Sequence, residues 1–231
     1  MDAHEWLSYM PLLVASVIVT LKLLVISGVA GFALAVCVAF ARISRNRLLA
    51  MLSFGFTDLI RGTPLLVQIY LLYYGVGALF AGWPWIRQSW MWAYLRDGFW
   101  YVACALTISV AAYVGEVMRA GLRGVPRGEI EAARAMGMSP WLVVRRIWLP
   151  RAIQILLPTL AGETVMLLKS TALASTVAVM DVLGAANYIR AQTLRTYEPL
   201  LVVAVIYVVL AFLIERAFAW LERRGPQRPA R

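Results

Sequence analysis

Few residues in this chain could carry chemistry in an apolar surrounding, and the most informative of them is a single carboxylate. Glu163 interrupts a run from Ala152 to Leu168 that is otherwise uncharged. A carboxylate in that position can bind an ammonium or guanidinium group of a solute, or it can form a structural bond to a neighbouring helix. The residues around it favour neither interpretation, so both stay open.

Catalytic and metal chemistry have little support in the sequence. His4 is the only histidine, so neither a His-based catalytic triad nor a multi-histidine metal site is expected. Cys37 and Cys104 both lie inside apolar stretches, as expected for free thiols that pack in a core. We therefore predict that the chain is not an enzyme, has no catalytic residues and holds no cofactor or metal.

Other polar side chains lie at the edges of the apolar runs. Gln68 follows the start of the second run by about one helical turn, where it can form an interhelical hydrogen bond or contact a solute. Thr171 and Ser175 follow the fourth run, where they can line a cavity or cap local helices. We keep these three with Glu163 as candidates for a substrate path. Asp58 and Arg61 are spaced to form an ion pair on one helix face.

The elements that position these residues are expected to lie in a membrane. Of the 231 residues, 62% are hydrophobic and 15% are charged, and the mean hydropathy is +0.75. A soluble domain of this size needs more polar residues to cover its surface, whereas a bilayer removes that demand. The composition therefore predicts an integral membrane protein.

Five apolar runs are long enough to cross a bilayer as helices. We predict an all-α protein in which residues 1–231 form a single transmembrane domain. The segment Ser170–Met180 is uncharged but too short to span, so we expect a re-entrant or surface segment there. The approximate spans are residues 20–41, 62–82, 98–118, 151–170 and 199–220.

The arginines predict the orientation of the spans. Sixteen of the 22 basic residues fall in the segment 42–61, the segment 116–151 and the tail from residue 216. By the positive-inside rule these three regions are cytoplasmic, which places the N-terminus outside and the C-terminus in the cytoplasm. The arginines lie between apolar runs, so the formal net charge of +10 indicates a lipid bilayer as the partner, and no nucleic acid.

The loop of residues 121–150 carries the most specific local pattern. Residues 130–136 are strong helix formers, with Glu131 and Arg134 spaced to pair. Gly137 can take the left-handed conformation that ends a helix. Ser139 can cap a second helix and Pro140 suits its first position, while Pro150 is expected to bend or end that helix. The pattern predicts two short helices at an angle.

This loop resembles the EAA loop of permease subunits in bacterial ATP-binding-cassette importers. The family pattern is Glu-Ala-Ala, three residues, Gly, nine residues and Ile-x-Leu-Pro, and this sequence follows it without a departure. Further stretches resemble the polar amino-acid uptake branch, which includes permeases for histidine, lysine, arginine, ornithine and opines: Thr20–Leu23, Arg61–Leu65 and Leu168–Leu173. The matching positions of the loop are Glu131, Ala132, Ala133, Gly137, Ile147, Leu149 and Pro150.

The resemblance implies a fold, a function and partners. The fold is a five-span type I importer permease with a cytoplasmic coupling helix, in the bacterial inner membrane. The partners are a second permease subunit, two cytoplasmic ATPase subunits that bind ATP and magnesium, and an external binding protein that delivers a polar, basic amino acid. The seven loop residues are then expected to couple the permease to its ATPase. The chain itself has no G-x-x-x-x-G-K-[ST] sequence for ATP. The alternative hypothesis is a self-sufficient secondary carrier or channel.

Overall fold

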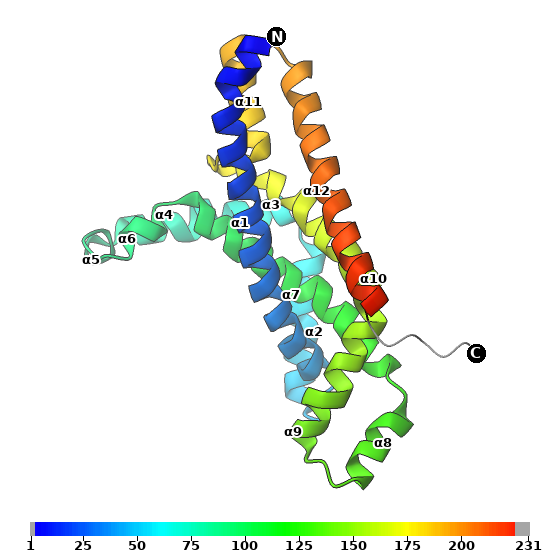
Figure 1. The fold of residues 1–231 in the computed structure, drawn as a ribbon. Coiled ribbons are helices and arrows are strands. Elements are labelled where there is room, and N and C mark those ends of the chain that lie inside the picture. The colour runs from blue at the N-terminus through cyan, green and yellow to red at the C-terminus, as the bar shows by residue number, and fades with distance from the viewer. Residues whose placement is uncertain (1–2, 225–231) are drawn as a thin grey trace.

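The structure, a computed structural model, describes residues 3–224, and every regular element in that range is a helix. Five helical segments are long and apolar enough to cross a membrane, as predicted. In Figure 1 the long helix α1 (Ala3–Arg42) stands upright, α12 (Tyr197–Arg224) runs beside it, and α7 (Gly98–Gly124) crosses behind it. The other two candidate spans are the continuous helical stretches Leu65–Gly82 and Pro140–Val177.

Shorter elements connect or make up these spans. The stretch Leu65–Gly82 has a π-helical turn in its middle, and the stretch Pro140–Val177 has a π-helical turn near its start and a 3-10 helix at its end. The elements are α2 (Arg47–Gly62), α3 (Leu65–Tyr70), η1 (Leu71–Val76), α4 (Gly77–Gly82), α5 (Pro84–Arg87), α6 (Trp92–Leu95), α8 (Arg127–Ala135), α9 (Pro140–Val143), η2 (Val144–Trp148), α10 (Leu149–Ser170), η3 (Thr171–Val177) and α11 (Val182–Thr193).

Two regions near the N-terminus are more helical than the sequence predicts. Helix α1 begins at Ala3 and includes Pro11, because a proline removes only one backbone hydrogen bond from a helix that is otherwise apolar. The basic segment 42–61, which lies outside the predicted spans, forms α2, which turns back along α1 and α7. Asn46 starts α2, since its side chain accepts hydrogen bonds from the backbone N–H of Leu48 and Leu49 at 3.0 and 3.4 Å.

Of the expectation that Pro150 bends or ends the helix before the fourth span, the second part is wrong, since the helix does not end there. The helix continues from α9 through η2 into α10, and Pro150 is the second residue of α10. Proline lacks the N–H that would bond to the carbonyl four residues earlier. The preceding turn is π-helical, with its wider i→i+5 bonding. We infer that this turn takes up the missing bond, so that the loop and the fourth span form one helical stretch.

Small residues allow α1 and α7 to cross closely. Ala35 and Ala39 are fully buried on α1, and together with Gly31 they recur every four residues. A Cβ atom on Gly31 would lie 2.6 Å from the Val110 side chain and 3.0 Å from the Thr107 carbonyl oxygen. This is the small-residue spacing that brings two membrane helices together without a hydrophobic driving force. The crossing forms the centre of the bundle.

The segment after the fourth span packs one face against the long helices of the bundle. Helix η3 continues α10, and α11 then packs against both α1 and α12. Asp181 caps α11, since its side chain accepts from the N–H of Gly184 at 2.8 Å, and it is fully buried. The N–H of Val182 donates to Thr20 Oγ1 of α1 at 3.2 Å. The start of α11 is therefore fixed to α1 by a hydrogen bond between residues that are far apart in the sequence.

Candidate functional site

The EAA loop, residues 121–150, turns at a glycine. Gly137 has a φ of +80°, a backbone conformation that is costly for residues with a side chain. Its N–H donates to the Arg134 carbonyl at 2.9 Å, and the N–H of Met138 donates to the Ala133 carbonyl at 3.2 Å. These two bonds form the Schellman motif that ends α8. The predicted helix stop at Gly137 is confirmed.

The second half of the turn also follows the sequence. Ser139 Oγ accepts from the N–H of Leu142 at 3.4 Å, and Pro140 is the first residue of α9. The expected pair of Glu131 with Arg134 is absent from the ion pairs among the described residues. An exposed pair gains little free energy, which gives it little reason to form.

The loop presents an apolar tip that sequence reasoning missed. Met136 is 80% exposed and Trp141 is 71% exposed, on either side of the Gly137 turn. The helical period gave no signal for it: Ala133 is buried, and Met136, three residues later, is exposed because α8 has ended at Ala135. Among the predicted coupling residues, Glu131, Ala132 and Gly137 are exposed, Ala133 is buried, and Ile147, Leu149 and Pro150 are half-buried.

The loop is bonded to the bundle at its other end. Trp148 Nε1 donates to the Leu122 carbonyl of α7 at 2.8 Å, and the Trp148 ring meets Phe40 of α1 edge to face at 5.6 Å. Arg151 of α10 pairs with Glu129 of α8 at 3.3 Å. The EAA loop is thus attached to the two helices that cross at the centre of the bundle.

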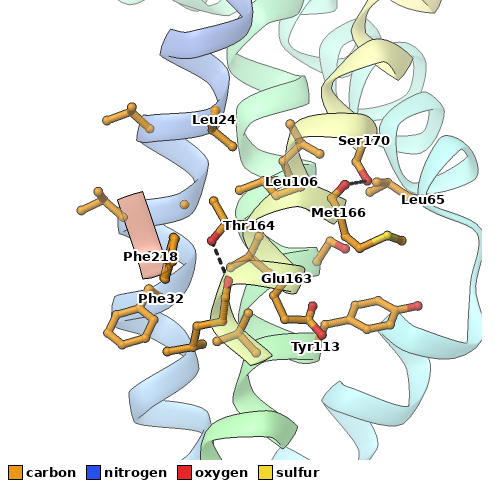
Figure 2. A pocket seen from close by; sticks show the side chains of 18 of the residues that line it. Leu24, Phe32, Leu65, Leu106, Tyr113, Glu163, Thr164, Met166, Ser170 and Phe218 are labelled. Carbon is orange, nitrogen blue, oxygen red and sulfur yellow. Dashed lines mark hydrogen bonds between the residues drawn. The ribbon is translucent and has the colours of Figure 1, made fainter. Parts of the chain in front are cut away.

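A cavity of about 790 Å³ lies between α1, α7 and α10, with Phe218 of α12 at one side (Figure 2). Most of its lining is aliphatic or aromatic. A pocket of this size and character can hold a small organic solute, oriented by a few polar groups. The lining includes Leu24, Val25, Val29, Phe32, Leu65, Leu106, Val110, Tyr113, Val114, Ile153, Leu157, Leu160, Glu163, Met166 and Leu167.

Glu163 is the only acidic or basic side chain that lines this cavity in the described part of the chain. It is half-buried, and it makes no hydrogen bond or ion pair with another described residue. In Figure 2 it points from α10 toward the side of the cavity where Tyr113 of α7 lies. The nearby hydroxyls of Thr164 and Ser170 donate to carbonyls of their own helix, at 2.8 and 2.9 Å. The carboxylate therefore has capacity left for a cationic ligand.

Gly162, next to Glu163 on α10, faces open space. A Cβ atom on Gly162 would meet nothing within 4 Å. The glycine is therefore not required for a tight helix crossing within this chain. The tight crossing on α10 lies elsewhere, where Leu156 reaches the backbone of Gly121.

The other predicted substrate-path residues lie away from the cavity. Gln68 Nε2 donates to the Ile60 carbonyl at 2.8 Å and to Thr63 Oγ1 at 2.9 Å, which joins α3 to the end of α2 and confirms the expected interhelical bond. The hydroxyls of Thr171 and Ser175 donate to carbonyls three residues earlier, at 2.6 and 2.8 Å. Of the four predicted substrate-path residues, only Glu163 lines the cavity. Tyr113 also lines it, and the sequence analysis did not identify that residue.

These features define a class of protein. The chain is a membrane bundle with an exposed helical loop at one end, a cavity with one free carboxylate between its helices, and no nucleotide-binding sequence. This is the architecture of a membrane-spanning transport subunit. Residues 28–225 match the family described as binding-protein-dependent transport system inner membrane component. The chain belongs to this family, as the EAA pattern indicated.

Its relatives are permease subunits of amino-acid importers. The octopine transport system permease protein OccM of Rhizobium meliloti is 41% identical over 230 residues, covering 97% of this chain and 92% of that protein. The nopaline permease NocM of Agrobacterium fabrum is 40% identical, covering 94% and 88%. The histidine/lysine/arginine/ornithine permease HisM of Escherichia coli is 37% identical, covering 91% and 87%.

Solved structures agree in fold. The crystal structure of an amino acid ABC transporter with histidines matches with a TM-score of 0.80 and 31% identity, covering 97% of this chain and 99% of that one. An inward-facing structure of the MetNI methionine transporter matches with a TM-score of 0.77, and at 22% identity it bears on the fold alone. The type I importer fold is confirmed. The relatives are permease subunits and not enzymes, and a self-sufficient carrier or channel is not favoured.

Proposed function

We propose that this chain forms the translocation path for a polar, basic amino acid of the histidine, arginine, lysine and ornithine class, within an ATP-driven importer. The observation that carries the proposal is the free carboxylate of Glu163 in an apolar cavity. A cationic side chain placed there gains a charge-assisted hydrogen bond, which the apolar lining of the cavity strengthens relative to bulk water. The names of the relatives support the same class, since several transport cationic amino acids or opines.

The proposal includes an orientation and partners. The arginine distribution supports a cytoplasmic EAA loop and C-terminus, with the N-terminus outside. Two cytoplasmic ATPase subunits that bind ATP and magnesium, a second permease subunit and an external binding protein complete the importer. Family membership supports the ATPase and the binding protein. The second permease subunit is either another copy of this chain or a sister chain.

The EAA loop is then the contact through which ATP acts. Closure of the ATPase pair draws the loops together and opens the bundle outward, and hydrolysis reverses the motion. The exposed Met136 and Trp141 provide apolar surface for the contact, and the Gly137 turn fixes their relative position. The bonds of Trp148 to α1 and α7 give the loop a connection to the helices around the cavity.

The substrate site is tested by Glu163→Gln, which keeps the shape of the side chain and removes its charge. Arginine should bind more weakly by about 1–3 kcal/mol, since one charged hydrogen bond is lost. Uptake of radiolabelled arginine by the reconstituted importer should fall as a result. Glu222→Gln, at the exposed end of α12, serves as the matched control and should transport normally. Unchanged uptake by Glu163→Gln would reject the carboxylate as a ligand.

Orientation and partners are tested separately. In a background without Cys37 and Cys104, cysteines introduced at Ser139 and Ser89 are treated with an impermeant thiol reagent in intact cells. We expect Ser89→Cys to be labelled and Ser139→Cys to be protected, and labelling of Ser139→Cys would overturn the orientation. Purification of the tagged chain followed by mass spectrometry should recover an ATPase, and recovery of the chain without one would contradict the proposed complex.

A further inference from the structure

A second, polar pocket of about 360 Å³ lies between α1, α2 and α7. Charged side chains of both signs line it, in contrast to the apolar cavity around Glu163. Its lining is Arg42, Phe54, Thr57, Asp58, Arg61, Gly62, Tyr113 and Glu116.

Two of its four charged residues are already paired. Arg42 Nη2 lies 2.6 Å from Glu116 Oε1, and Arg119 Nε lies 2.7 Å from Glu116 Oε2. The Arg42 guanidinium also stacks on the Phe54 ring, 4.7 Å from its centre. The carboxylate of Glu116 is thus held by two arginines, and this group ties α1 to α7.

The other two charged residues are Asp58 and Arg61. The sequence predicted an ion pair between them, and the structure does not contain it. Arg61 lies over the Tyr113 ring at 5.4 Å from its centre, within the range of a cation–π contact. The Tyr113 hydroxyl donates to the Arg61 carbonyl at 3.4 Å. Arg61 is held by Tyr113, and the Asp58 carboxylate makes no hydrogen bond or ion pair with the residues that the structure describes. The pocket therefore offers one anion and one cation, separately placed.

Tyr113 connects this pocket to the Glu163 cavity, because it lines both. A ligand whose cationic side chain binds Glu163 would therefore lie beside Tyr113. On the far side of that ring, Arg61 and Asp58 could contact the rest of the ligand.

We propose that Asp58 and Arg61 form a head-group subsite that binds the α-ammonium and α-carboxylate of the transported amino acid. The inference rests on the proposed function, since it names what recognises the second half of the same substrate. The Arg61 guanidinium can donate two parallel hydrogen bonds to a carboxylate, and the Asp58 carboxylate can accept from the ammonium. Glu163 alone cannot tell an amino acid from any other cation, whereas the two sites together select a cation that is also a zwitterion.

Three ligands separate these contributions. Arginine has the full head group, agmatine lacks its carboxylate, and 5-guanidinopentanoate lacks its α-ammonium. Binding of each is measured by calorimetry on the permease–ATPase complex in nanodiscs, without the binding protein. The variants are Arg61→Gln, Arg61→Lys, Asp58→Asn and Glu163→Gln. Arg47→Gln is the control, since Arg47 is an exposed arginine of the same helix that does not line the pocket.

The wild-type complex should bind arginine about tenfold tighter than either analogue, as expected for one charged hydrogen bond. Arg61→Gln should abolish the preference over agmatine only, with Arg61→Lys intermediate. Asp58→Asn should abolish the preference over 5-guanidinopentanoate only. Arg47→Gln should leave both preferences intact.

The contrary results are distinct. Equal binding of the three ligands by the wild type, or preferences that persist in Arg61→Gln and Asp58→Asn, would overturn the head-group subsite. The second result is also the one expected if the pocket holds a zwitterionic lipid head group. Unchanged binding by Glu163→Gln would overturn the proposed function while leaving the subsite, and no binding of any ligand by the wild type would contradict both.

Discussion

The EAA loop and the Glu163 cavity are built in opposite ways. Each feature of the loop comes from residues within a few positions of each other: Gly137 ends α8 and Ser139 starts α9. The cavity takes its walls from α1, α7, α10 and α12, and its one free charge from the middle of a long helix. The loop is therefore specified by local chemistry, whereas the cavity exists only once distant helices have packed.

This difference predicts different responses to mutation. A change in the loop should leave the bundle folded and impair only its communication with the ATPase. A change at a helix crossing should act on the fold, and a change at Glu163 should act on the substrate.

Gly137→Val should abolish coupling. The observed φ of +80° penalises a β-branched residue by at least about 1 kcal/mol, and the strain acts on the turn that positions Met136 and Trp141. The variant should insert normally, yet substrate-stimulated ATP hydrolysis by the reconstituted complex should fall to the unstimulated rate. Gly137→Ala should be milder.

Gly128→Val is the matched control for the turn. Gly128 lies in the same loop, with nothing within 4 Å of its Cβ position and without a positive φ. It should couple like the wild type. Normal coupling in Gly137→Val would show that the turn is not required and that our account of the loop is wrong.

Gly31→Ala should destabilise the bundle by about 1–3 kcal/mol, as expected for overpacking of a close contact. The added methyl group would lie 2.6 Å from Val110, and a backbone carbonyl behind it limits relaxation. Thermal unfolding of the purified chain in detergent measures the effect. Gly28→Ala on the same helix is the control, since its Cβ would lie at an ordinary 3.5 Å from Leu167. Equal melting temperatures for the two variants would refute close packing at the α1–α7 crossing.

Trp148→Phe should cost about 1 kcal/mol, because the hydrogen bond to the Leu122 carbonyl is lost while the ring still packs on Phe40. It should also loosen the coupling of the loop to the bundle, visible as ATP hydrolysis that responds less to substrate. Trp141→Phe serves as control for stability, since that ring is exposed. Wild-type stability and coupling in Trp148→Phe would show that Trp148 does not connect the EAA loop to the bundle.

Arg151→Gln should have the smallest effect, of about 1 kcal/mol or less. Its pair with Glu129 is partly exposed at 3.3 Å, and such pairs are screened by salt. The loss in melting temperature should shrink as the salt concentration rises. An effect that is large and independent of salt would mean that the pair is part of the coupling route.

The sequence could predict most of the loop and little of the cavity. Periodicity and hydropathy gave five spans, and Gly137, Ser139 and Pro140 gave the turn, because each depends on neighbouring residues. Glu163 was visible as a lone charge. Tyr113 and the unpaired Asp58 and Arg61 were not, since their roles come from α2 packing back on α7, and this packing depends on contacts between residues more than 50 positions apart.

The helix ends were the other weak point. Pro150 carried a strong local signal for a break, yet the helix continues through it with a π-helical turn before it. Local rules state what one residue disfavours. Such rules do not predict that the turn before Pro150 becomes π-helical and accommodates the proline. That result depends on how the whole of α10 packs against α7.

The most direct test of the account measures both activities in the same two variants. Arginine binding and substrate-stimulated ATP hydrolysis are determined for Gly137→Val and Glu163→Gln in the assembled, reconstituted importer. If the loop and the cavity have separate roles, Gly137→Val binds arginine like the wild type and fails to stimulate hydrolysis. Glu163→Gln should bind arginine more weakly by the 1–3 kcal/mol of a charged hydrogen bond, about 5- to 150-fold, and should still recover stimulation at saturating arginine. Loss of both activities in both variants would contradict the division of roles that the structure supports.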